Sequence, residues 1–225
     1  MRFDRFTSLP ETARGASLAL GNFDGLHIGH AAVIEAARAH RADTNVPWGV
    51  ASFEPPPRQF FQPAAAPFRI MTAETRAETL TEMGADLVFE LPFDAAMAAM
   101  TDRDFAEQVL RDGLGVSHVA IGFDFCFGRG RMGNPDTLRR FGHEMGFAVS
   151  VVEKVETGAV RVSSTAIRQA LEVGDVARAV ELMGRAWTVT GTVEAGAQRG
   201  RTIGFPTANL RLGPLIQPLH GVYAV

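Results

Sequence analysis

One stretch near the N-terminus constrains the fold more than any other part of the chain. Residues 18–20 are apolar, residues 21–29 carry three glycines, and an alanine-rich run follows over about 28–39. This order predicts a buried strand, a tight loop and a helix. Backbone N–H groups and the positive end of the helix converge at such a turn, which therefore suits a polyphosphate.

Two histidines stand where this loop meets the helix. His27 and His30 are three residues apart and share one helix face, so both imidazoles can hydrogen-bond one phosphoryl group. Gly29 between them adds no side chain that would block a ligand. Two other interpretations stay open: a turn whose glycines serve only backbone geometry, and a metal site, since paired histidines are common zinc ligands. The lone Cys126 and the lack of an H-E-x-x-H motif disfavour the metal.

Composition limits the class of protein. The chain has 225 residues, 46% hydrophobic and 21% charged, which is typical of a soluble globular protein with one large domain or two smaller ones. Its formal net charge of -3 gives no general attraction to nucleic acid or to an anionic membrane, so an anion site must be local. Lys154 is the only lysine, which excludes a G-K-[ST] phosphate loop and favours arginine for phosphate contacts.

The N-terminus carries no secretory pattern, and no apolar run approaches the roughly 20 residues that cross a bilayer. We therefore expect a cytoplasmic protein with small-molecule partners, no nucleic-acid or membrane partner, and a monomeric or weakly homo-oligomeric state.

Apolar strands and capped helices alternate over the first 184 residues. Strands are expected over 46–53, 86–91, 117–121 and 147–152, and helices over 73–83, over 105–110 with Gly113 closing it, from Asn134, and over 176–183. This alternation predicts an α/β fold with a mostly parallel sheet, whose ligands bind beyond the carboxyl ends of the strands. Gly21 and Gly122 both follow such strands.

Residues 121–133 form a second glycine-rich segment, with four glycines and two arginines. Asp124 can accept a hydrogen bond from a ribose or an amine, or help to hold a magnesium ion. Phe123, Phe125 and Phe127 alternate, which predicts that they share one buried face. Cys126 either belongs to the same core or lies outside it.

Three consecutive prolines precede an arginine and two phenylalanines in the segment 54–63. Such prolines predict a stiff, extended backbone that holds an aromatic wall against a flat ring. A proline-rich surface connection is the alternative.

A run of hydroxyl side chains, Ser163, Ser164 and Thr165, precedes Arg168. One hydroxyl is enough to cap a helix. Three in a row followed by an arginine predict a second phosphate cradle that faces the first, with the Arg168 fork reaching the same anion.

The pattern changes beyond residue 185. Residues 187–193 alternate as a half-exposed strand, and four glycines punctuate residues 196–213. We place a domain boundary between residues 184 and 185.

Together these motifs resemble those of one family. Residues 21–30 resemble the G-x-F-D-G-x-H-x-G-H signature of the H-x-G-H nucleotidyltransferases, and among them most closely the bacterial bifunctional riboflavin kinase/FAD synthetases. Segments 54–63, 121–133 and 162–168 resemble that family's flavin-bordering, V-G-x-D-F-x-F-G and I-S-S-T-x-I-R segments, and residues 191–210 and 220–225 resemble the opening of its riboflavin kinase barrel.

The resemblance implies a Rossmann-like FMN adenylyltransferase domain at 1–184 and the N-terminal part of a β-barrel riboflavin kinase domain at 185–225. It implies transfer of the adenylyl group of ATP to FMN, which gives FAD and pyrophosphate, with Mg²⁺ as cofactor. The full family protein also phosphorylates riboflavin. Since the later strands of the kinase barrel have no counterpart here, we expect the kinase part to be truncated and to yield little or no FMN.

The resemblance also implies roles for individual residues. The expected catalytic residues are His27, His30 and Arg168. The expected ATP-binding residues are Gly21, Phe23, Asp24, Gly29, Asp124, Ser164 and Thr165, and the expected flavin-binding residues are Asn22, Pro56, Pro57, Arg58 and Phe61. Thr207 and Asn209, in a P-T-A-N run, are the expected magnesium-binding residues of the kinase part.

Two rival functions stay open. One is another H-x-G-H transferase, such as a cytidylyl or pantetheine-phosphate enzyme, which the prolines and the P-T-A-N run disfavour. The other is a non-catalytic flavin- and nucleotide-binding module. The presence of His27, His30 and Arg168 disfavours that module but does not exclude it, because binding and catalysis use the same residues.

Overall fold

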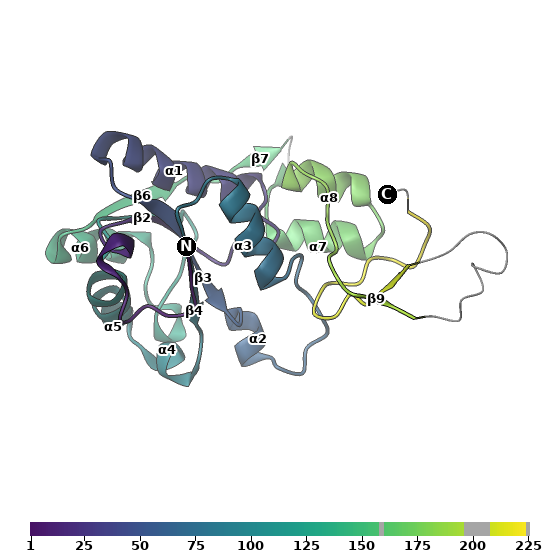
Figure 1. Cartoon of the computed structure of the whole chain (residues 1–225), viewed down its shortest axis with the longest axis horizontal. Helices are drawn as coiled ribbons and strands as arrows, with labels where there is room; N and C mark the ends of the chain where they lie inside the picture. Colours follow the sequence, from purple (N-terminus) through teal and green to yellow (C-terminus); the bar gives the residue numbers. More distant parts are fainter. Residues whose placement is uncertain (158–159, 196–207, 224–225) are drawn as a thin grey trace.

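A computed structural model describes residues 1–157, 160–195 and 208–223. A sheet with helices on both faces makes up one end of the molecule, and a pair of helices followed by the C-terminal segments makes up the other (Figure 1). The predicted Asn209 is among the described residues, whereas Thr207 lies outside them.

Six parallel strands form the central sheet in the order β1-β4-β3-β2-β5-β6. They are β1 (Arg2–Phe3), β2 (Ser17–Leu20), β3 (Trp48–Glu54), β4 (Leu87–Pro92), β5 (His118–Gly122) and β6 (Ala148–Val152). The chain runs from β2 through β3 to β4 and then returns to place β5 on the other side of β2. The strand order therefore reverses between β2 and β5, and such a switch point is where open α/β sheets bind ligands. The predicted parallel α/β fold is confirmed.

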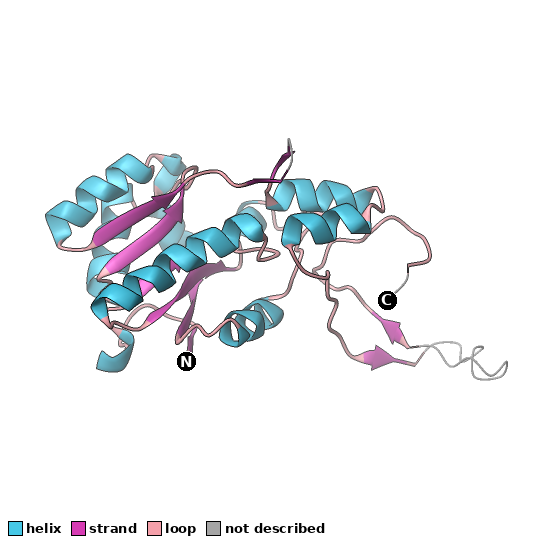
Figure 2. Ribbon diagram, turned by 90° about the horizontal axis from the view of Figure 1, so that it is seen from above, coloured by secondary structure: helices cyan, strands magenta, loops and turns pink. Residues whose placement is uncertain are grey.

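Helices cover both faces of this sheet (Figure 2). They are η1 (Glu11–Ala13), α1 (Ile28–Thr44), α2 (Pro57–Phe61), α3 (Ala73–Glu82), α4 (Ala95–Ala99), α5 (Asp102–Asp104), the π-helical η2 (Phe105–Leu114), η3 (Arg129–Arg131), α6 (Pro135–Met145), α7 (Ser164–Glu172) and α8 (Val176–Met183). Side chains from α4, η2 and α6 pack on one face, with Leu18 and Leu20 of β2. Side chains from α1 and α3 pack on the other, with Ala19 of β2 and Val50 of β3.

The last two helices have a core of their own. Apolar side chains of α7 and α8, among them Ile167 and Leu182, pack with Ile70, Val162 and Ile216. Ile70 comes from the connection between α2 and α3, and Ile216 comes from the C-terminal segment. This third cluster therefore joins the helix pair to the connection between α2 and α3 and to the C-terminal segment.

Local signals placed most helix ends correctly. Thr72, Ser163 and Asp175 each cap the helix that follows them, and Asn134 forms a capping box with Thr137. Two ends differ from the expectation. The first helix continues to Thr44, and η2 continues through Gly113 to a left-handed Gly115.

Gly113 has a packing reason to lie inside that helix. A Cβ atom at this position would lie 2.7 Å from the carbonyl oxygen of Phe6. The glycine therefore marks a close approach of the N-terminal segment rather than a helix end.

The expected strand over 187–193 is wrong. Only β9 (Val193–Glu194) is a strand there, and it pairs with β10 (Asn209–Leu210); a second small ribbon joins β7 (Glu156–Thr157) to β8 (Val160–Arg161). Residues 187–192 have no ladder partner among the described residues, and the indole N–H of Trp187 instead donates to the carbonyl oxygen of Ile70 at 2.8 Å.

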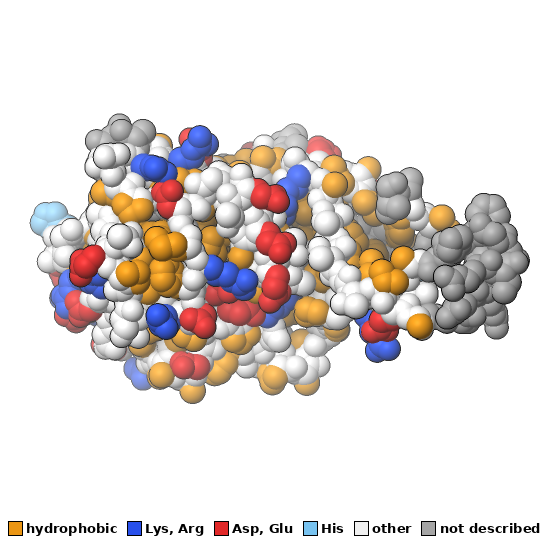
Figure 3. Space-filling view, in the orientation of Figure 1, with side chains coloured by type: hydrophobic (Ala, Val, Ile, Leu, Met, Phe, Trp, Pro, Cys, Tyr) orange, Lys and Arg blue, Asp and Glu red, His pale blue; other side chains and the backbone are white. Residues whose placement is uncertain are grey.

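Within the described parts of the chain, no helix is long and apolar enough to cross a membrane. Acidic side chains gather along α3 on the face shown in Figure 3, where Glu74, Glu78 and Glu82 recur at intervals of four residues.

A buried histidine joins β5 to its neighbours at the end of the sheet opposite the switch point. The Ser17 hydroxyl donates to the carbonyl oxygen of Ala37 and lies 2.7 Å from His118 Nδ1, and His118 Nε2 lies 2.9 Å from the Ser150 hydroxyl. Because the Ser17 hydrogen is already used, His118 donates through Nδ1 and accepts at Nε2, as a neutral ring does. Burial, with a smaller contribution from His40, which stacks on the ring, lowers the pKa of His118 to about 4.

We predict that His118 makes the fold less stable in mild acid. Its pKa is lower in the folded protein than the ordinary 6.5, so the unfolded chain binds the proton more readily, and stability is lost as the pH falls from about 6.5 toward about 4. Urea unfolding of wild type and of His118→Gln across this range tests the point. The stability difference between the two should shrink as the pH falls, and a difference that stays constant would contradict it.

Candidate active site

The loop between β2 and α1 is compact and strained. Phe23, Gly25 and Leu26 all have positive φ angles, of 49°, 91° and 45°. Two of these are not glycine, and such a conformation costs of order 1–3 kcal/mol each unless the surroundings hold it. Phe23 and Leu26 are buried in the core beneath α1, which supplies that hold. Strain of this kind concentrates at functional sites.

His27 and His30 stack on each other at the start of α1. Their ring centroids are 3.5 Å apart with an angle of 13° between the planes. His27 is the N-cap residue, and its Nδ1 accepts the backbone N–H of His30 at 3.1 Å. A neutral ring that accepts at Nδ1 carries its proton on Nε2, so His27 has one N–H to offer a ligand.

Both histidines are neutral. Burial, with a smaller contribution from the positive charge of Arg168, lowers the pKa of His27 to about 4. Burial also lowers the pKa of His30 well below its ordinary value, with smaller contributions from His27 and Arg168. His30 Nδ1 is buried and has no hydrogen-bond partner among the described residues. An unpaired buried nitrogen is costly, which favours a ligand that would bind it.

Gly29 lies close against the histidine stack. A Cβ atom at this position would lie 3.2 Å from both Cε1 and Nδ1 of His27. The glycine thus lets the His27 ring lie flat against the first turn of α1, in addition to leaving space for a ligand.

Asp24 is held by groups that come from two other parts of the chain. Its Oδ1 accepts the backbone N–H groups of Ile70 and Met71 at 2.9 and 3.2 Å, and its Oδ2 accepts Arg168 Nη2 at 2.6 Å. Its carbonyl oxygen accepts the Ser164 hydroxyl at 2.8 Å. Asp24 is buried and does not line the large cavity described below, and its contacts hold the loop after β2 in place.

Arg168 is the cation that pairs with Asp24. Its guanidinium binds Asp24 and, through Nε, the carbonyl oxygen of Phe68 at 2.8 Å, and it lies 5.4 Å from the centroid of the Phe68 ring. It does not line the large cavity. The fork that was expected to hold an anion therefore holds Asp24.

A cavity of about 880 Å³ opens at the switch point between β2 and β5. Loops after both strands, the first turns of α1 and α7, and α2 line it. The expected site residues that it brings together are Gly21, Asn22, Phe23, His27, Gly29, His30, Pro57, Arg58, Phe61, Asp124, Ser164 and Thr165. Pro56 stands just outside as the N-cap of α2. Asn209 lies in β10, which contributes nothing to the cavity lining.

Arg161 and Lys154 line the same cavity and were not among the expected site residues. Arg161 forms an ion pair with Asp124 and lies 4.9 Å from the centroid of the Phe123 ring. Lys154 is the second residue after the end of β6. The signal that could have found it is its position, since the sole lysine of the chain comes just after the carboxyl end of a predicted strand.

The expected shared apolar face of 123–127 is only partly right. Phe127 is buried in the core and Phe125 packs against it, with ring centroids 5.8 Å apart. Phe123 lies under Arg161 at the cavity instead, and Cys126 is exposed.

The proline segment is a helix rather than an extended wall. Pro56 is the N-cap and Pro57 the first residue of α2, a position where the missing N–H of proline costs nothing. Phe61, 65% exposed, extends from the end of this helix and meets Phe60 and Phe93 edge to face. An aromatic surface therefore borders the cavity, as expected, although its backbone is helical.

An ionic network fixes where this segment leaves the sheet. Arg69 forms a fork with Glu54 at 2.5 and 3.1 Å, and the buried Arg76 reaches Glu54 at 3.3 Å. Glu54 is the last residue of β3 and precedes the prolines. Sequence reasoning missed this network because its members are far apart in the chain and match no motif.

No group of three or more histidine, cysteine or acidic side chains that could hold a metal ion occurs among the residues that the structure describes. Asp124, in the glycine-rich segment 121–133, and Glu153, just after β6, are exposed carboxylates that line the cavity. One carboxylate fits a magnesium ion that takes its remaining ligands from substrate phosphates and water.

A doubly wound parallel sheet with a glycine-rich loop and paired histidines at its switch point defines an α/β nucleotide-binding protein. The family models agree: residues 9–166 match the FAD synthetase model and residues 183–225 match the riboflavin kinase model. The chain belongs to the FAD synthetase family.

Curated relatives carry both activities in their names. The chain is 41% identical to the bifunctional riboflavin kinase/FMN adenylyltransferase of Pseudomonas fluorescens over 94% of its own length and 68% of the relative. It is 40% identical to the protein of that name from Escherichia coli K12, over 94% of its length and 67% of the relative. A solved structure described as a macrolide-efflux protein from Streptococcus pneumoniae superposes with a TM-score of 0.82 at 30% identity, covering 93% of this chain and 68% of that one.

We predict that Arg168→Ala destabilises the protein by about 3 kcal/mol, because it leaves the carboxylate of Asp24 buried without its cation. Urea unfolding measures the loss. Arg178→Ala, which breaks a more exposed pair with Glu181, is the control and should cost under about 1 kcal/mol.

The double variant Asp24→Asn/Arg168→Ala separates the pair from other effects. Its loss should be smaller than the two single losses combined, because the charge that each single variant strands is then gone. Additive losses would show that Arg168 acts independently of Asp24.

Proposed function

We propose that this chain transfers the adenylyl group of ATP to FMN and releases pyrophosphate, with FAD as product. The observation that carries the proposal is the make-up of the cavity at the switch point. Stacked neutral histidines and the start of α7 line one part of it, and α2 with Phe61 lines another. Phosphate-binding groups and an aromatic surface thus share one cavity, as a reaction between ATP and a flavin phosphate requires.

The reaction needs no covalent intermediate on the protein. A phosphate oxygen of FMN attacks the α-phosphorus of ATP, the bond from that phosphorus to the bridging oxygen breaks, and pyrophosphate leaves with its electron pair. The protein contributes position and charge stabilisation.

The chain's own residues divide these tasks. His27 donates its Nε2 hydrogen to a phosphate oxygen, and His30 offers the buried nitrogen that has no partner among the described residues. Thr165 offers its hydroxyl, and the start of α7 offers backbone N–H groups where the helix dipole favours an anion. The Ser164 hydroxyl donates to the carbonyl oxygen of Asp24 and so helps to hold the loop after β2. Arg161 and Lys154 bring positive charge to the same cavity.

A magnesium ion, when bound, would shield the phosphate charges during transfer, with Asp124 as the protein carboxylate nearest to them. Asp24 and Arg168 act indirectly, because they hold the loop that ends at His27. Arg58 and Phe61 on α2 border the flavin ring.

Incubation of the protein with FMN, ATP and magnesium should give FAD and pyrophosphate in equal amounts, resolved by chromatography. Matched reactions with CTP in place of ATP, and with phosphopantetheine in place of FMN, test the rival transferases. Binding of both substrates without FAD formation would favour the non-catalytic module, and product from phosphopantetheine alone would favour the other transferase.

We predict that His30→Ala lowers kcat for FAD formation by about a hundredfold, because a preorganised contact to the reacting phosphates is lost. His143→Ala, an exposed position near the end of α6, is the matched control and should keep wild-type activity. Full FAD formation by a folded His30→Ala protein would remove His30 from the reaction.

A further inference from the structure

The segment 185–187 follows α8 and contacts the loop between β2 and α1, residues 21–27. This loop is called the nucleotide loop below. Arg185 Nη2 donates to the carbonyl oxygen of Gly25 at 3.3 Å. Gly25 lies between Asp24 and the histidine pair in the loop after β2. A residue beyond the predicted domain boundary thus contacts the backbone of the loop that carries the proposed catalytic groups.

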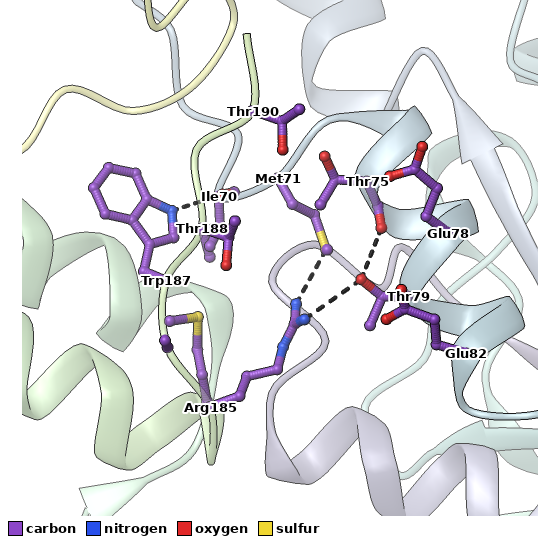
Figure 4. A pocket seen from close by; sticks show the side chains of 12 residues that line it. Ile70, Met71, Thr75, Glu78, Thr79, Glu82, Arg185, Trp187, Thr188 and Thr190 are labelled. Carbon is purple, nitrogen blue, oxygen red and sulfur yellow. Dashed lines mark hydrogen bonds between the residues drawn. The ribbon is translucent and has the colours of Figure 1, made fainter. Parts of the chain in front are cut away.

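Trp187 reaches the same loop through one intermediate residue, Ile70. The indole N–H of Trp187 donates to the carbonyl oxygen of Ile70 at 2.8 Å, and the N–H of Ile70 donates to Asp24 Oδ1 at 2.9 Å. The Ile70 side chain also packs against Gly25, where an added Cβ would lie 3.1 Å from two of its carbons. Figure 4 shows the bond from Trp187 to Ile70 and the Arg185 guanidinium beside Met71.

Residues 68–71 receive further bonds from both sides. Arg168 donates to the carbonyl oxygen of Phe68, and Ile216 donates its N–H to the carbonyl oxygen of Arg69 at 2.8 Å. The 68–71 segment therefore lies between the nucleotide loop on one side and the C-terminal residues on the other.

The cavity of about 220 Å³ beside Arg185 is not suited to an anionic substrate. Glu78 and Glu82 of α3 line it together with Arg185 and Trp187 (Figure 4). The Arg185 guanidinium bonds weakly to Thr79 Oγ1 at 3.5 Å and to Met71 Sδ at 3.8 Å, and its Nε is buried without a partner among the described residues. Burial lowers the pKa of Arg185. Such a costly placement of a cation indicates that its contact with the loop matters.

We propose that Arg185 and Trp187 are positioning residues for adenylyl transfer: they fix Gly25 and the 68–71 segment, and through Asp24 they hold the loop that carries His27. This inference rests on the proposed function for its kinetic consequence. Its structural part, that these two side chains order the nucleotide loop, stands without it.

Trp187→Phe is the sharper test, because it keeps an aromatic ring and removes only the N–H that bonds Ile70. We expect the backbone amides of Ile70 and His30 to exchange with deuterium about tenfold faster, which is the order of effect of one lost hydrogen bond. The exchange rate of the amides in β5 is the internal reference. Arg185→Lys, which keeps the charge but lacks the fork, should increase exchange at the same amides.

In steady-state FAD formation, measured well below the midpoint of thermal unfolding, both variants should lower kcat at least tenfold per folded molecule, because small misplacements of catalytic groups are costly. KM for FMN should change less than twofold. Arg178→Ala on α8 is the matched control, since Arg178 pairs with Glu181 and does not contact the loop.

The outcomes separate the two proposals. Faster exchange with reduced kcat supports the positioning role. Variants that unfold at lower temperature but keep wild-type kcat and wild-type exchange would overturn it and leave a purely structural role. Faster exchange in a protein whose wild type makes no FAD would support the ordering of the loop and refute the proposed function instead.

Discussion

The buried carboxylate of Asp24 is the constraint on which the rest of the site depends. A carboxylate removed from water must have its charge and lone pairs satisfied, and here two backbone N–H groups and one guanidinium do so. Those partners come from the 68–71 segment and from α7, which lie far from Asp24 in sequence. One side chain thus joins the loop after β2 to the third apolar cluster, and the start of α7 faces the start of α1 as a result.

This arrangement also sets the charge state of the histidines. Arg168 is held near them by Asp24, and its charge adds to burial in keeping both rings neutral. A neutral imidazole can donate from one nitrogen and accept at the other, whereas a protonated ring can only donate. The pair is therefore suited to orienting phosphates by hydrogen bonds, with the positive charge supplied by arginine and lysine.

The fold was largely predictable because its signals are local. Neighbours within a few residues determine the strand, loop and helix around residues 18–39. The same is true of helix caps such as Thr72 and Asn134. The partners of Asp24 and Arg168 were not predictable, since a carboxylate and an arginine that bind each other carry the same sequence pattern as two residues that bind a nucleotide. The prolines were predicted wrongly for a related reason. Pro57 is compatible with both an extended chain and the first turn of a helix. The contact of Glu54 with Arg69, which fixes where the chain leaves β3, joins residues that are far apart in the sequence.

The charge distribution explains how a chain with a net charge of -3 can bind anions. Acidic side chains lie along α3, outside the large cavity. The cavity itself is lined by more cationic than acidic side chains: Arg58, Arg131, Lys154 and Arg161 against Asp124 and Glu153. A concave surface with low-dielectric walls focuses the field of such groups, so the local potential differs in sign from that of the whole molecule. Arg58 belongs to the same short helix as Phe61, which places a charge beside the aromatic surface. A ligand with both a phosphate and a flat ring would satisfy this cavity better than a ligand with either one alone.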